Sequence, residues 1–186
     1  MAMLDLNLQF CSNLAILGAN VNSFVWDSLT GQMLTGTTFT PMPPNAIDGN
    51  TTYFGMDFGI GSSPGTPRII GEVNTAFLSG TSLQVAFQGA PDNATAHANG
   101  LLASLVFVTH IETDPIPIAQ LTLNTPLFSF SWPMRQFTTP VPRFFRLLFK
   151  PTGTFTAGTV SADVALQDVF SASTLPQFSS NFVAPH

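Results

Sequence analysis

The amino-acid sequence predicts an all-β fold, an antiparallel jelly roll or β-sandwich with extended N- and C-terminal arms. Three observations support this fold class: strand-like segments recur along the chain, most of the 15 prolines fall between them, and no stretch keeps a helical period. A chain of 186 residues without an internal shift in composition is expected to form a single domain, residues 1–186. We expect a core of about residues 20–168, with arms at residues 1–19 and 169–186.

Eight segments have the composition of strands, and eight is the strand number of a jelly roll. They are residues 21–26, 51–58, 68–74, 82–88, 101–111, 127–132, 143–150 and 159–166. The last two are predicted to pair through a loop that contains Gly153 and Gly158. Because glycine accepts positive φ, we expect a bulged or longer hairpin at this loop.

The segment of residues 101–111 is nearly continuous in apolar side chains. Its β-branched and aromatic content favours a central strand, buried on both faces, over a helix. Residues 94–102 permit one short helix, which Gly100 weakens.

Both termini carry apolar residues at regular or scattered positions. Residues 3–10 alternate, and their apolar side consists of Leu4, Leu6, Leu8 and Phe10. This pattern suits equally a strand added to the sheet edge of another subunit and an ordinary first strand of the chain's own fold. Residues 169–186 are predicted either to lie along a neighbouring subunit or to form a disordered tail, and their apolar anchors include Phe170, Phe178 and Phe182.

The composition is poor in charge, with 8% charged residues, 45% hydrophobic residues and 18 Phe. A neutral polar surface of this kind suits a protein with permanent partners better than a freely diffusing monomer. The net charge is −5 and Lys150 is the single lysine, so the chain has no basic stripe and direct nucleic-acid binding is not expected. No apolar run reaches the roughly 18 residues of a membrane span, so we expect no membrane partner.

The sequence contains no convincing catalytic or metal-binding pattern. The three histidines and the single Cys11 lack the spacing of a zinc site, and the carboxylates Glu72, Glu112 and Asp114 form no recognisable pair. Residues 61–65 match Gly-x-Ser-x-Gly, but Pro64 has no N–H to offer an oxyanion. We therefore expect a protein that is not an enzyme and that uses no cofactor or metal.

Three of the four arginines, Arg135, Arg143 and Arg146, lie close together in the sequence. An arginine on a strand can bind carboxylates across an interface or inside one subunit. A pair with Asp163 or Asp168 in the same subunit is the favoured interpretation, and Arg146 is kept as a candidate partner contact.

The late part of the chain resembles the capsid cement, or decoration, proteins of tailed bacteriophages, particularly the Bordetella-phage type. The matching residues are Arg146-Leu147, Gly153 and the segment from Phe155 to Ala162, with weaker similarity at residues 3–5, 23–27, 56–61 and 82–88. The resemblance implies a structural virion protein on the outer surface of the phage head. Such a protein stabilises the capsid by bridging neighbouring copies of the major capsid protein, and it acts as a homodimer at capsid two-fold positions.

Two other functions fit the same fold class. A carbohydrate-binding β-sandwich would use exposed aromatic platforms, for which the chain offers Trp26, Trp132 and Tyr53. A self-assembling jelly-roll shell protein would form particles by itself. A shell protein that packages nucleic acid usually has a basic arm, whereas residues 1–20 contain neither Lys nor Arg.

Overall fold

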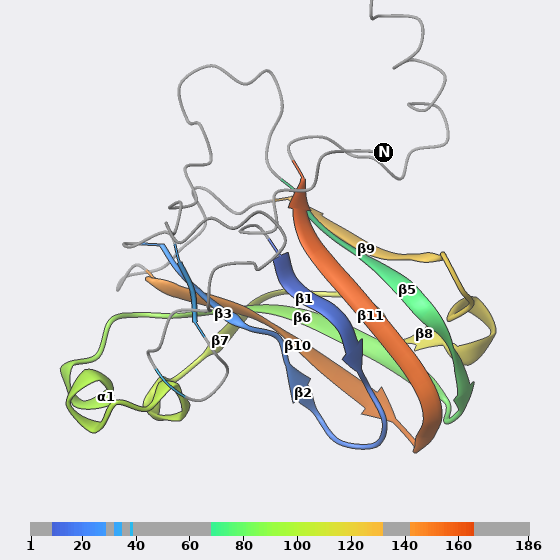
Figure 1. Ribbon diagram of the computed structural model, residues 1–186, viewed down its shortest axis with the longest axis horizontal. Helices are drawn as coiled ribbons and strands as arrows, with labels where there is room; N and C mark the ends of the chain where they lie inside the picture. Colours follow the sequence, from blue (N-terminus) through green and yellow to red (C-terminus); the bar gives the residue numbers. More distant parts are fainter. Residues whose placement is uncertain (1–8, 29–31, 35–37, 39–67, 132–141, 166–186) are drawn as a thin grey trace, which may run out of the picture.

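The computed structural model describes residues 9–28, 32–34, 38, 68–131 and 142–165, which form two antiparallel β-sheets packed face to face (Figure 1). The first sheet has the strand order β1 (Gln9–Ala15), β11 (Phe155–Ala165), β5 (Arg68–Ser79) and β9 (Pro126–Ser131). The second sheet has the order β4 (Gln32–Leu34), β3 (Val25–Asp27), β10 (Phe144–Thr152), β6 (Ser82–Ala90) and β7 (Val108–Glu112). Two short strands complete it, β2 (Val21–Asn22) on β10 and β8 (Ile116–Pro117) on β6. The prediction of an all-β antiparallel sandwich is confirmed.

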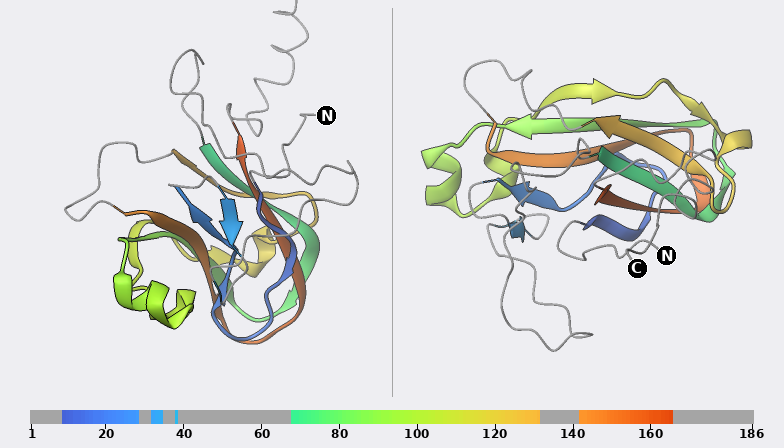
Figure 2. Two further views of the ribbon diagram at one scale, coloured as in Figure 1. Left: turned by 60° about the vertical axis from the view of Figure 1, so that its left-hand side comes forward. Right: turned by 90° about the horizontal axis from the view of Figure 1, so that it is seen from above.

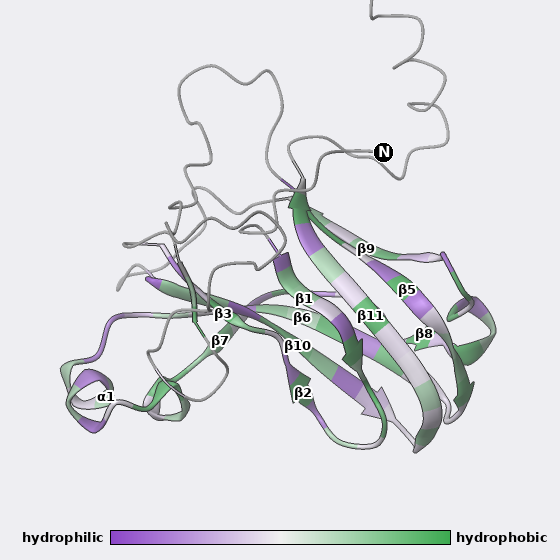
Figure 3. Ribbon diagram, viewed as in Figure 1, coloured by the Kyte–Doolittle hydropathy of each residue, from purple (hydrophilic) through white to green (hydrophobic). Residues whose placement is uncertain are grey.

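The main core fills the space between the two sheets, which Figure 2 shows as two layers. In β10, Phe145 and Leu147 belong to this core, whereas Arg146 between them faces outward. Figure 3 shows hydrophilic bands between apolar ones along β5 and β10. Phe87 of β6 stacks on Phe145 of β10 at 5.6 Å between ring centroids. Phe10 of β1 meets Phe87 edge-on at 6.4 Å, which brings the two sheets into contact.

The central feature is a two-stranded ribbon that is folded over itself. The chain from β5 into β6 lies antiparallel to the chain from β10 into β11, in a register that runs from Arg68 opposite Ala165 to Ala90 opposite Phe144. Each of these two segments passes from one sheet to the other, and the crossings, at Gly80 and Gly153, lie side by side. The Thr81 N–H donates to the Thr152 carbonyl at 2.9 Å, which joins the two crossings.

The predicted hairpin of residues 143–166 is therefore wrong in its pairing. Both strands exist, but β10 pairs with β2, β3 and β6, whereas β11 pairs with β1 and β5. Gly153 has φ 79°, a conformation that favours glycine, and it lets the chain leave the second sheet for the first.

Gly158 also differs from its predicted place in the loop. The connection consists of Gly153 and Thr154 alone, because β11 already begins at Phe155. Gly158 lies inside β11 with φ 145°, where a Cβ atom would come within 2.3 Å of the Phe77 ring. Gly158 thus makes room for an aromatic ring on the neighbouring strand.

The apolar residues 101–111 do not form a central strand. They comprise the short 3-10 helix η2 (Leu102–Ser104) and the start of β7, the strand at one edge of the second sheet. Leu102 and Leu105 are buried, whereas Val106 and Val108 are 71% and 57% exposed. Apolar composition predicted burial here, but the position of β7 at the edge leaves part of the segment facing solvent.

The permitted short helix is present as α1 (Ala94–Asn99). The Asn93 side chain caps it by accepting from the N–H groups of Thr95 and Ala96. Gly100 follows in the left-handed conformation, φ 65°, so this glycine ends the helix rather than weakening its interior. A second 3-10 helix, η3 (Ile118–Gln120), lies before β9. None of the helices in the described part of the chain is long and apolar enough to span a bilayer.

The N-terminal boundary of the core falls earlier than predicted. β1 (Gln9–Ala15) pairs with β11 of the same chain, so residues 9–19 belong to the sandwich and not to an arm. Residues 3–10 were open to two interpretations, a strand added to another subunit and a first strand of the chain's own fold. Gln9 and Phe10, the described part of this segment, agree with the second, because they belong to β1.

Candidate partner-binding surface

A second, smaller core lies on the outer face of the second sheet. Helix α1 and the 3-10 helix η2 cover one end of that face, which we call the helical end (Figure 1). Its buried residues come from both sheet and helices: Val25, Leu34, Ala90, Ala96, Leu102, Leu105 and Phe144. The half-buried Phe107 packs against this cluster from the segment that leads into β7. The helical end is thus a packed part of the fold.

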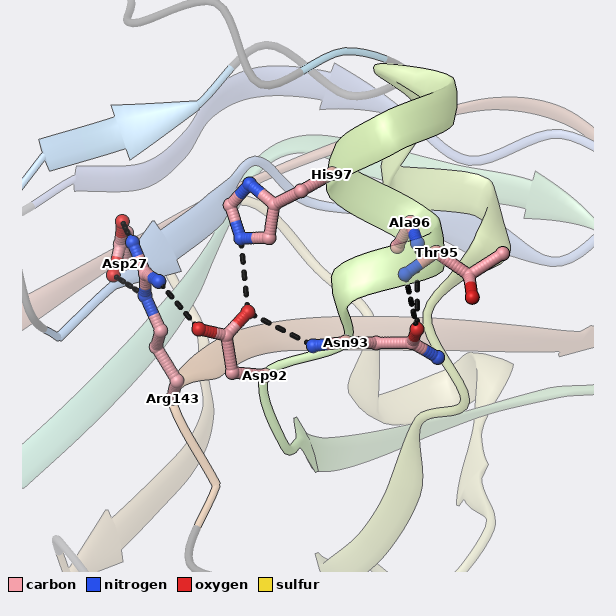
Figure 4. Close-up of polar contacts among 7 residues, drawn as sticks. All are labelled: Asp27, Asp92, Asn93, Thr95, Ala96, His97 and Arg143. Carbon is pink, nitrogen blue, oxygen red and sulfur yellow. Dashed lines mark hydrogen bonds and ion pairs between the residues drawn. The ribbon is translucent and has the colours of Figure 1, made fainter.

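Arg143 holds the helical end together through two carboxylates (Figure 4). Its Nε and Nη2 donate to the two oxygens of Asp27 at 2.8 and 2.7 Å, and its Nη1 donates to Asp92 at 2.7 Å. Asp92 also lies 2.9 Å from Nε2 of His97 on α1. The network joins β3, the start of β10 and the segment before α1, and Asp27 is only 3% exposed.

The charges in this network shift each other's pKa values. The hydrogen bonds from Arg143 to Asp27 raise the pKa of the guanidinium, against the lowering effect of burial, and Asp92 raises it further. Burial alone would raise the pKa of Asp92, but the hydrogen bond and charge of Arg143 lower it. Arg143 and its carboxylates therefore form a satisfied structural cluster at neutral pH.

Arg146 has a different environment. Its Nε donates to Oε1 of Gln88 at 2.9 Å, and its guanidinium carbon lies 3.8 Å from the centroid of the Phe107 ring. Burial lowers the pKa of Arg146. Among the described residues no carboxylate forms an ion pair with Arg146.

The favoured pairing of Arg146 with Asp163 is wrong, because the two residues lie on opposite outer faces of the sandwich. Leu147 of β10 and Ala162 of β11 both point into the main core, so their neighbours Arg146 and Asp163 point outward from different sheets. Asp168 and Arg135 lie outside the described residues. The intramolecular arginine pairing is instead the one that Arg143 makes.

A polar ladder runs across the second sheet from Arg146. Arg146 is opposite Gln88, and Gln88 is opposite Thr109 on the edge strand β7. The Gln88 Nε2 donates to the Thr109 hydroxyl at 3.1 Å while its Oε1 accepts from Arg146. Gln88 is only 7% exposed, so the ladder holds the Arg146 side chain in one orientation.

Lys150 lies on the same outward-facing side of β10 as Arg146. Its Nζ is 2.6 Å from Oε1 of Glu112, so the lysine has an acidic partner on the same sheet. The pair is partly exposed, and exposed ion pairs of this kind contribute about 0–1 kcal/mol.

Large exposed apolar side chains lie near two ends of the sandwich, with one group at the helical end and one where the ribbon crosses between the sheets. Leu101, Val106 and Val108 are 46%, 71% and 57% exposed at the helical end. At the other end, which we call the arch end, Leu17 and Leu78 are 48% and 58% exposed. Both lie beside the start of β11, because the Leu17 carbonyl accepts from Phe155 N–H and Leu78 is opposite Ala157.

The outer face of the first sheet carries a carboxylate that resists ionisation. Burial raises the pKa of Asp163 to about 6, against a hydrogen bond from Gln9, and the charge of Glu72 adds to the rise. Burial, together with Asp163, raises the pKa of Cys11 to about 12, so this thiol is an unreactive part of the core. His110 is half-buried beside Phe87, and burial lowers its pKa.

The candidate partner residues fall into three groups. Phe10 is fully buried in the main core, which removes it from the surface contacts because its side chain already packs inside this chain. Arg146 is on the outer face, and its Nη1 and Nη2 have no hydrogen-bond partner among the described residues. The remaining candidates lie outside the described residues: Leu4, Leu6, Leu8, Phe170, Phe178 and Phe182.

Sequence reasoning missed the aromatic neighbour of Arg146 and two exposed side chains beside it in the chain. Phe107, which contacts Arg146, and the exposed Val106 and Val108 lie within residues 101–111, for which one buried strand is predicted. The signal that could have separated them is Gly100 followed by polar Ser104, which divides the run before β7.

No set of three metal-binding side chains is present among the described residues. Glu112, one of the candidate carboxylates, is bound to Lys150. In comparisons with known proteins, no family model and no curated protein matches the chain. The described surface is therefore characterised by its own geometry: a charge-poor sandwich, exposed apolar residues near both ends and an arginine without an acidic partner.

Proposed function

We propose that this protein is a non-enzymatic capsid cement protein, which binds the outer surface of an assembled phage head and bridges neighbouring major capsid proteins. The observation that carries the proposal is the pair of exposed apolar groups at the helical end and the arch end. Strand β6 runs from the arch end to the helical end over 9 residues, which corresponds to about 30 Å. Contacts that far apart suit the bridging of two different subunits.

The strand order supports the jelly-roll form of the sandwich. If β2 and β3 count as one strand, β7 and β8 as another, and the short edge strand β4 is set aside, eight strands follow in chain order. The two sheets then read 1-8-3-6 and 2-7-4-5, with β4 as an additional edge strand. In this order the folded ribbon of β5–β6 and β10–β11 lies in the middle of both sheets. The remaining strands flank it, β1 and β9 in the first sheet and β2–β3 and β7–β8 in the second, as in jelly rolls.

The residues that resemble cement proteins lie on the folded ribbon. Arg146 and Leu147 are in β10, Gly153 is at the crossing, and Phe155 to Ala162 form most of β11. They support a shared architecture, while the exposed residues near the two ends supply the candidate contacts.

The mechanism is thermodynamic linkage. A protein that binds only the assembled shell stabilises that state by mass action. Burial of about 1,000 Å² of apolar surface contributes on the order of 25 kcal/mol before association costs, which offset most of it. Contacts repeated over a symmetric shell then add through avidity.

The rival functions have weaker support. Trp26 is 4% exposed and packs against Phe145 at 5.6 Å, so it offers no platform for a sugar ring. Tyr53 and Trp132 lie outside the described residues. The shell-forming alternative rests on the fold class alone.

Cryo-electron microscopy of the purified protein, with and without capsids of the virus that encodes it, tests the proposal. We expect no particles from the protein alone and added density on the outside of the capsid, together with a higher temperature of capsid disruption. Particles formed by the protein alone would support a shell protein, and absence of capsid density would refute the cement function.

A further inference from the structure

We propose that Arg146 is the centre of a carboxylate-binding site for an acidic side chain of the capsid subunit that the protein contacts. The site consists of Arg146 and its supports Phe107 and Gln88. The inference rests on the proposed function, because it identifies which side chain of the cement protein would meet the shell.

The guanidinium is held in place while most of its hydrogen-bonding capacity stays unused. Gln88 accepts from Nε, and the Phe107 ring covers one face of the planar group. Stacking on an aromatic ring uses no N–H group, so the four N–H bonds of Nη1 and Nη2 remain without a hydrogen-bond partner among the described residues. These two nitrogens form the fork that binds both oxygens of a carboxylate.

The positive charge of Arg146 is not compensated in the described part of the chain. Each of the other cations on β10 and at its start has a carboxylate, since Arg143 binds Asp27 and Asp92, and Lys150 binds Glu112. Arg146 is half-buried and carries a desolvation cost, which its lowered pKa reflects. A partner carboxylate would supply the missing charge in a site that is already partly shielded from water.

The surroundings favour a protein partner. Val106 and Val108 flank Phe107 in the sequence and are 71% and 57% exposed, so exposed apolar side chains lie at the same end of the sandwich as Arg146. Arginine and aromatic side chains are enriched among the energetically important residues of protein interfaces, and here Arg146 stacks on Phe107. A carboxylate side chain within an apolar segment of the capsid subunit matches both features.

The test compares three variants in binding to purified capsids. Arg146→Met keeps the length of the side chain over Phe107 but removes the charge and the fork, and we expect affinity to fall by about tenfold or more. Arg146→Lys keeps the charge without the fork, and we expect a smaller loss. Lys150→Met removes one positive charge from the same face of the same strand, and we expect less than about twofold change because Lys150 already has Glu112.

Melting temperatures and two-dimensional NMR spectra check that each variant is folded, because Gln88 loses a donor in Arg146→Met. If the wild-type protein binds capsids and Arg146→Met binds equally well, the carboxylate site is refuted and the cement function stands. A change in the oligomeric state of Arg146→Met would assign the site to a contact between copies of the chain and would also refute it.

A measurement without capsids separates failure of the site from failure of the proposed function. The Arg146 guanidinium NMR signals of the wild-type protein are followed during titration with sodium acetate, with sodium chloride at equal ionic strength as the control. We expect acetate to shift the Arg146 signals and to leave those of Arg143 unchanged, since Arg143 is occupied by Asp27 and Asp92. Equal responses to acetate and chloride would overturn the inference even if the protein binds no capsid.

Discussion

Arg143 and Arg146 are three positions apart, yet their partners give them different roles. Arg143 directly precedes the strand β10 and meets two carboxylates, one of them nearly fully buried. Arg146 faces outward and rests on an amide and an aromatic ring. The sequence identified both residues because cations are scarce in this chain, with 5 Lys and Arg in total. Their partners come from β3, β6 and the segments before α1 and β7, which are distant in the sequence, so local patterns could not assign them.

Asp27→Ala should destabilise the fold by about 2–4 kcal/mol, because it removes the carboxylate that makes two hydrogen bonds to Arg143 inside the protein. Urea unfolding at pH 7 measures the change. Asp92→Ala is the matched control and should cost about 0–1 kcal/mol, since the Asp92 side chain is 51% exposed. Equal losses from the two variants would contradict a structural role specific to the buried pair.

Asp163 predicts a pH dependence of stability. Its pKa of about 6 in the folded protein exceeds the ordinary value of 3.8, so the folded state binds more protons than the unfolded state between these values. Folding stability should therefore fall as pH rises from about 4 to about 6 and should stay reduced above that range.

Asp163→Asn should remove this component and stabilise the protein at pH 7.5 by about 2 kcal/mol. Thermal unfolding of both proteins between pH 4 and pH 7.5 provides the measurement. The exposed Asp114→Asn is the control, and the same pH profile for wild type and Asp163→Asn would refute the assignment.

At the scale of elements, the ribbon formed by β5–β6 and β10–β11 is the feature that organises the sandwich. Strand positions follow from composition, turn signals and, for residues 82–88 and 143–150, alternation, all of which are local properties, and residues 68–74 are also found as a strand-like segment. Alternation does not specify which strands pair, because two strands joined by a glycine connection can form a hairpin or can enter different sheets. Here the full-length pairing with β5–β6 favours the crossing at Gly153.

Gly158→Ala should destabilise the protein by about 2 kcal/mol or more, because the new Cβ would meet the Phe77 ring at a backbone conformation that L-residues rarely adopt. Chemical unfolding measures the effect. Gly100→Ala is the control that separates the steric clash from the cost of positive φ. Gly100 also has positive φ, but nothing lies within 4 Å of the position that the new methyl group would occupy. The control should cost about 1 kcal/mol, and an equal cost at both sites would show that the ring contact is unimportant.

At the scale of the whole molecule, the sandwich presents exposed apolar residues near two separated ends and an incompletely satisfied cation near one of them. A bridging protein needs separate contacts on one rigid body, and the folded ribbon provides this rigidity because it connects both sheets. The terminal residues Leu4, Leu6, Leu8, Phe170, Phe178 and Phe182 remain proposed as additional contacts.

Deletion of residues 1–8, and separately of residues 169–186, tests the terminal contacts. We expect each truncated protein to saturate capsids at higher concentration and to protect them less from heat, because apolar anchors are lost. Deletion of residues 1–10 is a useful contrast, since it also removes Phe10 from the core and should cost about 3–5 kcal/mol of folding stability. Full protection by the protein without residues 1–8 and by the protein without residues 169–186 would refute a role for the termini in capsid binding.

The sequence alone determined the all-β class, the positions of most described strands and the short helix, because alternation and capping depend on neighbouring residues. Tertiary structure decided which sheet each strand joins, where residues 101–111 become exposed and which groups meet Arg143 and Arg146. These features depend on strand register and packing between residues far apart in the chain, such as Arg146 opposite Gln88. A local pattern contains no information about that register.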